Sequence, residues 1–302
     1  MSGSDQRIEQ AFESLGSKTG SPSQVRIGLF GRGIGASLTP VMHEQEGRRL
    51  GLDYRYDLID FDRLDLRDTD LAAMLAGAAA RGFAGLNVTY PFKQTIAPLL
   101  DGLSPEATAI GAVNTVVFRD GGSTGYNTDC WGFAESFRSH FGPVALDRVI
   151  QIGAGGAGSA VAQALVDLGA GALDIVDAQA ERAQALAAHI VHRGGAIARA
   201  VPPDQVAEAL WGASGVVNAT PVGMAKHPGL PIDPALLGAD HFVVDIIYFP
   251  RETALIQAAR SQGCSVLPGG GMAVHQAARA FSLFTGLAPD SAAMGRTFAA
   301  HA

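Results

Sequence analysis

The segment GAGGAG at residues 153–158 is the feature that most restricts the fold of this chain. It is a G-x-G-x-x-G motif, directly preceded by an apolar strand predicted at 148–152 and followed by an apolar helix predicted at 157–169. The next predicted strand, 172–177, ends in Asp177, about 20 residues after the last glycine, where dinucleotide-binding domains carry an acidic residue. This arrangement predicts a parallel α/β domain that binds a dinucleotide.

Each glycine of this motif has its own physical role. Gly153 allows the tight turn, Gly155 lets the pyrophosphate approach the backbone, and Gly158 lets the helix lie close to the strand. The N-terminus of the helix then faces the phosphates. The loop residues predicted to contact the cofactor are Gly153, Ala154, Gly155, Gly156 and Ala157.

Asp177 also bears on the identity of the dinucleotide. A carboxylate accepts hydrogen bonds from a ribose 2′-hydroxyl but repels a 2′-phosphate. The next two residues, Ala178 and Gln179, bring no positive charge, whereas Arg182 could stack on adenine or reach a phosphate. The sequence therefore favours NAD over NADP.

A second glycine-rich segment, GRGIGA at 31–36, has a different context. It follows a predicted strand but runs into SLTP rather than into a long apolar helix. We interpret it as a loop on the substrate side. Its neighbours Ser37 and Thr39 could bind a carboxylate, or one of them could cap the helix that begins near Pro40; the spacing leaves both open.

Strands and helices are predicted to alternate along the whole chain. Strands are predicted at 25–31, 53–61, 83–90, 148–152, 172–177, 196–201, 215–220 and 242–248, and helices at 40–52, 70–82, 157–169, 180–194 and 271–286. This alternation is typical of α/β folds with parallel sheets, and 302 residues exceed one ordinary domain core. The first 24 residues are expected to form a loose extension with a short helix near 8–15.

We therefore predict two α/β domains with a ligand cleft between them. Residues 1–124 form an N-terminal substrate-binding and catalytic domain with a parallel-type sheet, joined by the C-terminal helices of 271–302. Residues 125–270 form a doubly wound Rossmann domain that binds NAD.

Charge and composition exclude several classes of function. The net charge is −7 and basic residues form no stripe, so nucleic acid is not an expected partner. Cys130 and Cys264 cannot form a disulfide framework, and Cys and His residues lack zinc spacing, so no metal is expected. No apolar run is long enough for a membrane span, and the N-terminus lacks the apolar core of a signal peptide. We expect a cytoplasmic protein.

Three short polar motifs lie within apolar runs, where an α/β fold builds its ligand site. They are NVTYPFK at 87–93, GAVNTVV at 111–117 and GYNTDCWGF at 125–133. Lys93 and Asp129 are the candidates for catalysis. Each motif has a simpler interpretation: Lys93 as a solvated loop charge, Asn114 as a turn residue and Asp129 as a helix cap. The isolated His43, His227 and His275 are predicted to be structural.

These motifs resemble those of the shikimate dehydrogenase family, from about residue 27 to residue 290. The resemblance rests on SLTP, NVTYPFK, GAVNTVV, GYNTD, GAGGAG, NATPVGM (218–224), DIIYFP (245–250) and GGGMAVHQA (269–277), in the family order. Asp177, NVTYPFKQ and Thr39 are most similar to the members that use NAD, the quinate/shikimate dehydrogenases. The family more often has Ser in place of Thr39, and its NADP-using members carry a basic residue after the second strand of the nucleotide domain.

The resemblance implies a role for each matching position. Lys93 and Asp129 match the catalytic pair beside the reacting hydroxyl, and Ser37 and Thr39 match the hydroxyls that hold the substrate carboxylate. Residues that match the lining of the polyol are Thr89, Asn114, Tyr248 and Gln276. Residues that match the cofactor side are Thr220, Pro221, Ile246 and the loop from Gly269 to Met272.

The predicted activity is reversible oxidation of a ring hydroxyl of shikimate or quinate to the 3-dehydro ketone, with hydride transfer to NAD. The substrate is a small polyol carboxylate, and the protein is a monomer or a homodimer. In the reductive direction Lys93 would donate the proton to the developing alkoxide. Two alternatives stay open: a dehydrogenase of an aminated analogue, aminoshikimate or aminoquinate, and a non-catalytic regulator that binds NAD or a shikimate-like ligand.

Overall fold

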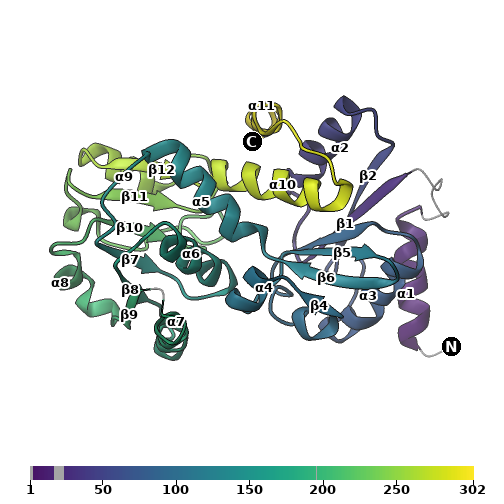
Figure 1. The fold of residues 1–302 in the computed structure, drawn as a ribbon, viewed down its shortest axis with the longest axis horizontal. Helices are drawn as coiled ribbons and strands as arrows, with labels where there is room; N and C mark the ends of the chain where they lie inside the picture. The colour runs from purple at the N-terminus through teal and green to yellow at the C-terminus, as the bar shows by residue number, and fades with distance from the viewer. Residues whose placement is uncertain (1–2, 17–23, 195) are drawn as a thin grey trace. The chain divides into compact units, whose positions relative to one another are not determined.

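The computed structural model describes residues 3–16, 24–194 and 196–302. The chain forms two compact units, the first made of residues 1–128 with 277–301 and the second of residues 129–276 with residue 302 (Figure 1). Both unit boundaries fall inside helices, α5 (Thr128–Phe141) and α10 (Gly270–Thr285). The boundaries predicted from the sequence, after residues 124 and 270, lie a few residues earlier.

The first unit contains a six-stranded sheet in the order β2-β1-β3-β5-β6-β4. Strands β2, β1 and β3 are parallel, as the strand–helix alternation predicts, whereas β5 runs antiparallel to β3 and β6. Asp120 and Gly121, both with positive φ, form the turn between β5 and β6, a pair typical of two-residue hairpins. The strands are β1 (Val25–Gly31), β2 (Tyr54–Asp60), β3 (Gly85–Val88), β4 (Gly102–Leu103), β5 (Thr115–Arg119) and β6 (Gly122–Tyr126).

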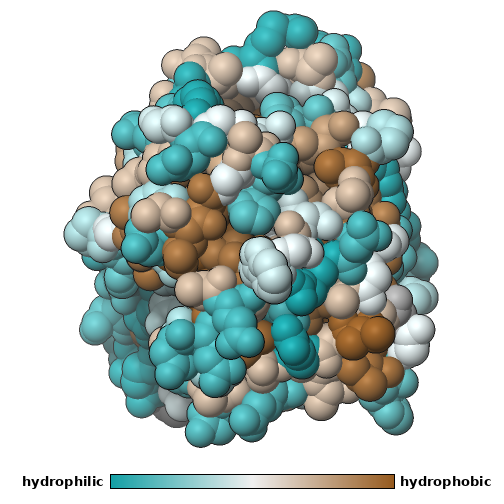
Figure 2. Space-filling model, turned by 90° about the vertical axis from the view of Figure 1, so that its left-hand side faces the viewer, coloured by the Kyte–Doolittle hydropathy of each residue, from teal (hydrophilic) through white to brown (hydrophobic). Residues whose placement is uncertain are grey.

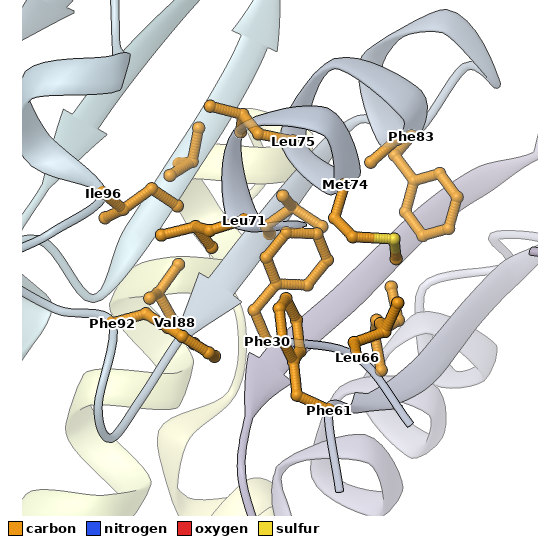
Figure 3. Close-up of a cluster of buried hydrophobic side chains, with 14 of the residues drawn as sticks. Phe30, Phe61, Leu66, Leu71, Met74, Leu75, Phe83, Val88, Phe92 and Ile96 are labelled. Atoms are coloured by element: carbon orange, nitrogen blue, oxygen red, sulfur yellow. The ribbon is translucent and has the colours of Figure 1, made fainter. Parts of the chain in front are cut away.

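Helices cover this sheet and enclose an apolar core. The helices are α1 (Gly3–Ser14), α2 (Thr39–Arg49), α3 (Leu71–Ala80), α4 (Pro105–Ile110) and α11 (Ser291–His301). Figure 3 shows the core side chains of α3 beside those of the sheet and its loops: Leu71 and Met74 lie near Phe30 of β1 and near Phe61 and Leu66, which follow β2. The core therefore includes side chains at or directly after the carboxyl ends of β1, β2 and β3, namely Phe30, Phe61 and Val88, and so it anchors the loops that follow these strands.

The N-terminal segment is more ordered than the sequence predicts. Residues 3–14 form α1, whose Ile8 and Phe12 are buried in the same apolar core. The Arg81 guanidinium stacks over the Phe12 ring and pairs with Glu9. The predicted short helix near 8–15 is confirmed by α1, the prediction of a loose extension is wrong for residues 3–7, and residues 17–23 lie outside the described part of the chain.

The second unit is a parallel six-stranded sheet in the order β12-β11-β10-β7-β8-β9. Its strands are β7 (Arg148–Ile152), β8 (Ala172–Val176), β9 (Ile197–Ala200), β10 (Gly215–Asn218), β11 (Phe242–Asp245) and β12 (Ser265–Pro268). The helices between them are α6 (Gly156–Asp167), α7 (Ala180–His192), α8 (Val206–Leu210) and α9 (Ala254–Ser261). Counted from β7, this is the doubly wound order 3-2-1-4-5-6, so the predicted Rossmann domain is confirmed.

The surface of the second unit mixes polar and apolar side chains. Figure 2 shows several separate hydrophobic patches with hydrophilic residues between them. Scattered apolar surface of this kind is normal for a soluble domain. No helix within the described ranges is long and apolar enough to cross a membrane.

A fully buried histidine joins α2 to the sheet of the first unit. The Nδ1 atom of His43 lies 2.9 Å from the Tyr54 hydroxyl, and its ring contacts the rings of Tyr56, Phe281 and Phe284. Burial lowers the pKa of His43 from 6.5 to about 3. His43 is therefore neutral in the folded protein at neutral pH, which agrees with its predicted structural role.

This histidine should make stability depend on pH. Because its folded pKa is below its unfolded pKa, the unfolded chain binds the extra proton, and stability is lost as pH falls below 6.5 toward about 3. We expect the His43 contribution to cost about 1.4 kcal/mol one pH unit below the unfolded pKa. His43→Gln, which can still hydrogen-bond to Tyr54, should remove this part of the acid sensitivity. Urea unfolding of the original protein and of His43→Gln at about pH 7.5 and about pH 5.5 measures the loss of unfolding free energy between the two pH values. An equal loss in the two proteins would contradict the assignment of this pH dependence to His43.

Candidate active site

The substrate-side candidates of the first unit lie along one edge of its sheet. Segments leave this edge after β1 and β3, and β5 begins there because it runs antiparallel to β3. The Arg32 N–H donates to the Tyr90 carbonyl at 3.1 Å, which joins the segments that follow β1 and β3. The Val113 N–H donates to the Lys93 carbonyl at 2.7 Å. Backbone hydrogen bonds therefore hold together the loops that carry Ser37, Thr89, Lys93 and Asn114.

The loop that carries Ser37 and Thr39 is shaped by Asp60 at the end of β2. The buried Asp60 carboxylate accepts hydrogen bonds from the N–H groups of Gly33 and Ile34, at 3.1 and 3.0 Å. The N-cap residue of α2 is Leu38, which makes no side-chain capping bond, whereas the Ser37 hydroxyl accepts a hydrogen bond from the N–H of Thr39, the first residue of α2, at 3.4 Å. Both hydroxyls stand at the positive end of the α2 dipole, which suits an anionic group.

Thr89 and Lys93 lie on the turn that follows β3. Both side chains are partly buried. A methyl group added at Gly31 would come within 2.4 Å of the Thr89 methyl carbon, so Thr89 packs directly on the end of β1. The ring of Phe92, the residue before Lys93, is buried against Phe61 in the core. Lys93 is thus carried by a well-anchored turn and not by a loosely solvated loop.

Asn114 is almost fully buried and is held in one orientation. Its Nδ2 group donates to the Thr128 hydroxyl at 2.9 Å, and its Oδ1 atom accepts from the Thr128 N–H at 2.8 Å. Asn87 donates to Thr115 and accepts from the Tyr56 hydroxyl. This buried network fixes the start of β5 and the first residue of α5, directly before Asp129.

Asp129, Tyr248 and Gln276 belong to the second unit. Asp129 lies in the first turn of α5, and Tyr248 lies in the segment after β11. Desolvation of the Tyr248 phenol and the nearby Asp129 carboxylate both raise the pKa of Tyr248, although 40% of the residue is exposed. The Gln276 backbone lies against Gly132 of α5, where a methyl group would come within 2.7 Å of it. These three candidates therefore gather around the start of α5.

The geometry of the GAGGAG loop fits a dinucleotide. Gly153 has φ +106°, and a side chain there would meet the backbone of Ala219 at 2.7 Å. A methyl group at Gly158 would lie 2.3 Å from the Gly153 carbonyl, so helix and strand are in close contact. A methyl group at Gly155 would meet no atom within 4 Å. The tight turn at Gly153 and the close contact at Gly158 agree with the predictions, and the backbone at Gly155 is open, whereas contact with a pyrophosphate stays a prediction.

Asp177 is connected to this loop by its carboxylate. One oxygen accepts from the Ala154 N–H and the other from the Gln179 N–H, both at 2.8 Å. The side chain remains partly exposed, so further lone pairs can accept from a ribose. Arg182 is exposed in the first turn of α7.

The remaining cofactor-side candidates lie after β10, β11 and β12 and at the start of α10. Thr220 is tied to Asn218, whose Oδ1 atom accepts from the Thr220 N–H and hydroxyl at 3.0 and 2.7 Å. Gly269 lies against the Ile246 carbonyl: a methyl group added at Gly269 would lie 2.2 Å from the Ile246 carbonyl oxygen. Pro221 is exposed, and Met272 is buried on α10.

Several residues that shape the site were not predicted. Gln151, fully buried in β7, donates from Nε2 to the carbonyls of Gly153 and Gly158, both at 2.8 Å, and so clamps the glycine-rich loop. Asn87, Asn218 and Asp245 hold neighbouring strand ends together. One signal was available for all four: a polar residue inside an otherwise apolar strand must find hydrogen-bond partners there.

The described residues contain no group of three or more His, Cys, Asp or Glu side chains arranged to hold a metal ion.

Comparison with known proteins places the chain in a family. Residues 29–116 match the model of the shikimate dehydrogenase substrate binding domain, and residues 269–296 match that of the shikimate 5′-dehydrogenase C-terminal domain. The chain is 51% identical over 269 residues to the shikimate dehydrogenase (NADP(+)) of Streptomyces avermitilis. The aligned region covers 89% of this chain and 92% of that protein. The chain belongs to the shikimate dehydrogenase family.

Relatives that are named for NAD match the chain as well. The quinate/shikimate dehydrogenase (NAD(+)) of Corynebacterium glutamicum is 46% identical over 276 residues, covering 91% of this chain and 98% of that protein. The solved structure of quinate dehydrogenase from Corynebacterium glutamicum in complex with NAD matches with a TM-score of 0.87 and 45% identity, covering 92% and 99% of the two chains. Close relatives of this chain therefore include both NADP(+) and NAD(+) enzymes.

Proposed function

We propose that this protein is an NAD-dependent dehydrogenase that oxidises the ring hydroxyl of shikimate, quinate or both to the 3-dehydro ketone. Its membership of the shikimate dehydrogenase family supports the reaction class, because relatives at 45–51% identity over about nine tenths of the chain bear these names. A nicotinamide dinucleotide is the cofactor that these relatives are named for. The choice of NAD rests on Asp177.

The substrate-side roles follow from the chemistry of a polyol carboxylate. Ser37 and Thr39, at the positive end of α2, bind the carboxylate. Thr89, Asn114, Tyr248 and Gln276 donate to or accept from the ring hydroxyls. Asn114 suits this role because its amide is already held in one orientation by Thr128.

Lys93 and Asp129 act on the proton of the reacting hydroxyl. Oxidation of a secondary alcohol releases a hydride, which the bound nicotinamide accepts, and a proton, which a base must take. Lys93 takes this proton in the oxidative direction and returns it to the developing alkoxide in the reductive direction. Asp129 orients the ammonium.

The cofactor is held by the GAGGAG loop and by Asp177. Gly153 to Ala157 and the N-terminus of α6 bind the pyrophosphate. The Asp177 carboxylate accepts from the ribose hydroxyls and repels a 2′-phosphate, and the two residues that follow it, Ala178 and Gln179, carry no positive charge to offset that repulsion. Arg182 stacks on the adenine, and Thr220, Pro221, Ile246, Gly269 and Met272 line the nicotinamide side.

Formation of NADH from NAD with shikimate and with quinate tests this function directly. We expect turnover with at least one of the two substrates and a higher kcat/KM with NAD than with NADP, because Asp177 repels the additional phosphate. Aminoshikimate and aminoquinate are assayed in parallel. Faster turnover of an amino analogue would reassign the substrate, and binding of NAD without turnover of any of the four would indicate a regulator.

A further inference from the structure

Asp245, the last residue of β11, is a buried carboxylate that the proposed reaction does not use. It is fully buried, and among the described residues no arginine, lysine or histidine forms an ion pair with it. A buried charge is costly unless it is paired or well hydrogen-bonded. The question is what this charge does in a dinucleotide-binding unit.

The hydrogen-bond network around Asp245 is built for the ionised form. Its Oδ1 atom accepts from Asn218 Nδ2 and from the Ile247 N–H, both at 3.0 Å. Its Oδ2 atom accepts from the Thr253 hydroxyl at 2.6 Å.

Two of these hydrogen bonds, from the Asn218 amide and from the Ile247 N–H, have a fixed direction. Asn218 presents its amide nitrogen to Asp245 because its oxygen accepts from the Thr220 N–H. The Thr253 hydroxyl accepts from the Ile256 N–H with one lone pair, which leaves its hydrogen available to donate to Asp245. Burial raises the pKa of Asp245, and these three donors oppose that shift. Three donors and no acceptor face the two oxygens, so the network is satisfied by a carboxylate.

The place of Asp245 in the sheet puts it on the nicotinamide side. In a doubly wound sheet, the acid after the second strand, here Asp177 after β8, binds the adenosine ribose, and the pyrophosphate lies at the helix after the first strand. The other half of the dinucleotide must therefore extend across β7 to the carboxyl ends of β10 and β11. Asp245 is the residue at the carboxyl end of β11.

The oxidised nicotinamide ring carries a positive charge, and the reduced ring is neutral. We propose that the buried, unpaired charge of Asp245 selects the redox state of the cofactor, by binding the oxidised form more tightly than the reduced form. The proposal rests on the proposed function only in requiring that the second unit binds NAD. With an effective dielectric constant of about 20, one unit charge within roughly 12 Å of the ring changes the affinity for NAD relative to NADH by about tenfold or more.

The test is the ratio of the dissociation constants for NAD and NADH, measured by calorimetry on the purified protein without substrate. Asp245→Asn removes the charge but keeps the network, because the new amide nitrogen can donate to the Thr253 hydroxyl. We expect this variant to weaken NAD relative to NADH by on the order of tenfold. Asp245→Ser, neutral and smaller, tests the same charge if the asparagine variant does not fold.

Thr253→Val is the matched control, because it breaks the network and leaves the charge. It is expected to change both dissociation constants together and to leave their ratio within about twofold of the original protein. An unchanged ratio in Asp245→Asn, with both cofactors still bound, would overturn the proposal. If the original protein binds neither cofactor, the proposed function fails instead, so the two failures are distinguishable.

Discussion

Replacing Lys93 by methionine is expected to lower kcat by about 10²- to 10⁴-fold, with only a small change in KM. Methionine keeps most of the apolar stem and removes the ammonium, so it takes away proton transfer while preserving the packing of the turn. The buried ring of Phe92 and the backbone hydrogen bond to Val113 hold this turn in either case. Steady-state kinetics with NAD and the better of shikimate and quinate measure the effect.

Gln94→Met is the matched control for this prediction. Gln94 is the next residue on the same turn and is exposed, so its replacement tests whether the turn tolerates the change itself. It should keep kcat within about twofold of the original protein. If Lys93→Met and Gln94→Met retain similar turnover, Lys93 has no catalytic role and its charge is a solvated loop charge after all.

Replacing Asp177 by alanine is expected to raise KM for NAD by about 10- to 100-fold. The carboxylate is proposed to hold the ribose, and it also accepts hydrogen bonds from Ala154 and Gln179, so its loss loosens the phosphate loop as well. Repulsion of the 2′-phosphate disappears at the same time, so the preference for NAD over NADP should fall. Kinetics with both cofactors measure both effects.

Glu181→Ala is the control for Asp177→Ala. It shows whether the cofactor preference depends on the proposed contact between Asp177 and the ribose or only on the loss of one negative charge nearby. Glu181 is an exposed carboxylate in the first turn of α7, four residues after Asp177. We expect its removal to leave the NAD-to-NADP preference nearly unchanged. A preference that stays unchanged in Asp177→Ala would mean that another residue discriminates between the cofactors.

The second unit was the more predictable part of this molecule. Its strands are short apolar runs, α6 and α7 are marked by apolar periodicity, and GAGGAG fixes which strand is first, whereas the helices α8 and α9 were not predicted. Local sequence therefore predicted nearly every strand and the doubly wound fold. It missed β12 (Ser265–Pro268), an edge strand with alternating exposure and a terminal proline, which resembles a loop in the sequence.

The first unit was less predictable because its distinctive features depend on distant residues. The turn of the β5–β6 hairpin is marked in the sequence by Asp120-Gly121. The sequence does not show, however, which of the other strands the hairpin pairs with, and in the structure that strand is β3. Helix α1 is short and mostly polar, and it is held by Phe12 and Glu9 against Phe83 and Arg81, about 70 residues away.

The candidate site also has a part that local sequence predicts and a part that depends on distant residues. Lys93, Asp129 and the glycine-rich loop were found from local motifs, while the residues that hold them were not. Asn87, Asn218 and Asp245 act through partners on other strands, and only the pairing of those strands reveals the partners. A sequence shows that a buried polar residue needs a partner, but not which one it has.

The discontinuous first unit has a consequence for synthesis on the ribosome. Apart from residue 302, the second unit is one continuous stretch of chain, so all its strands are available before residues 277–301 have been made. The first unit lacks Phe281 and Phe284 until then, and these rings complete the buried surroundings of His43. Domains generally fold as units while the chain emerges. The half of the protein that is translated first is therefore expected to reach its final structure last.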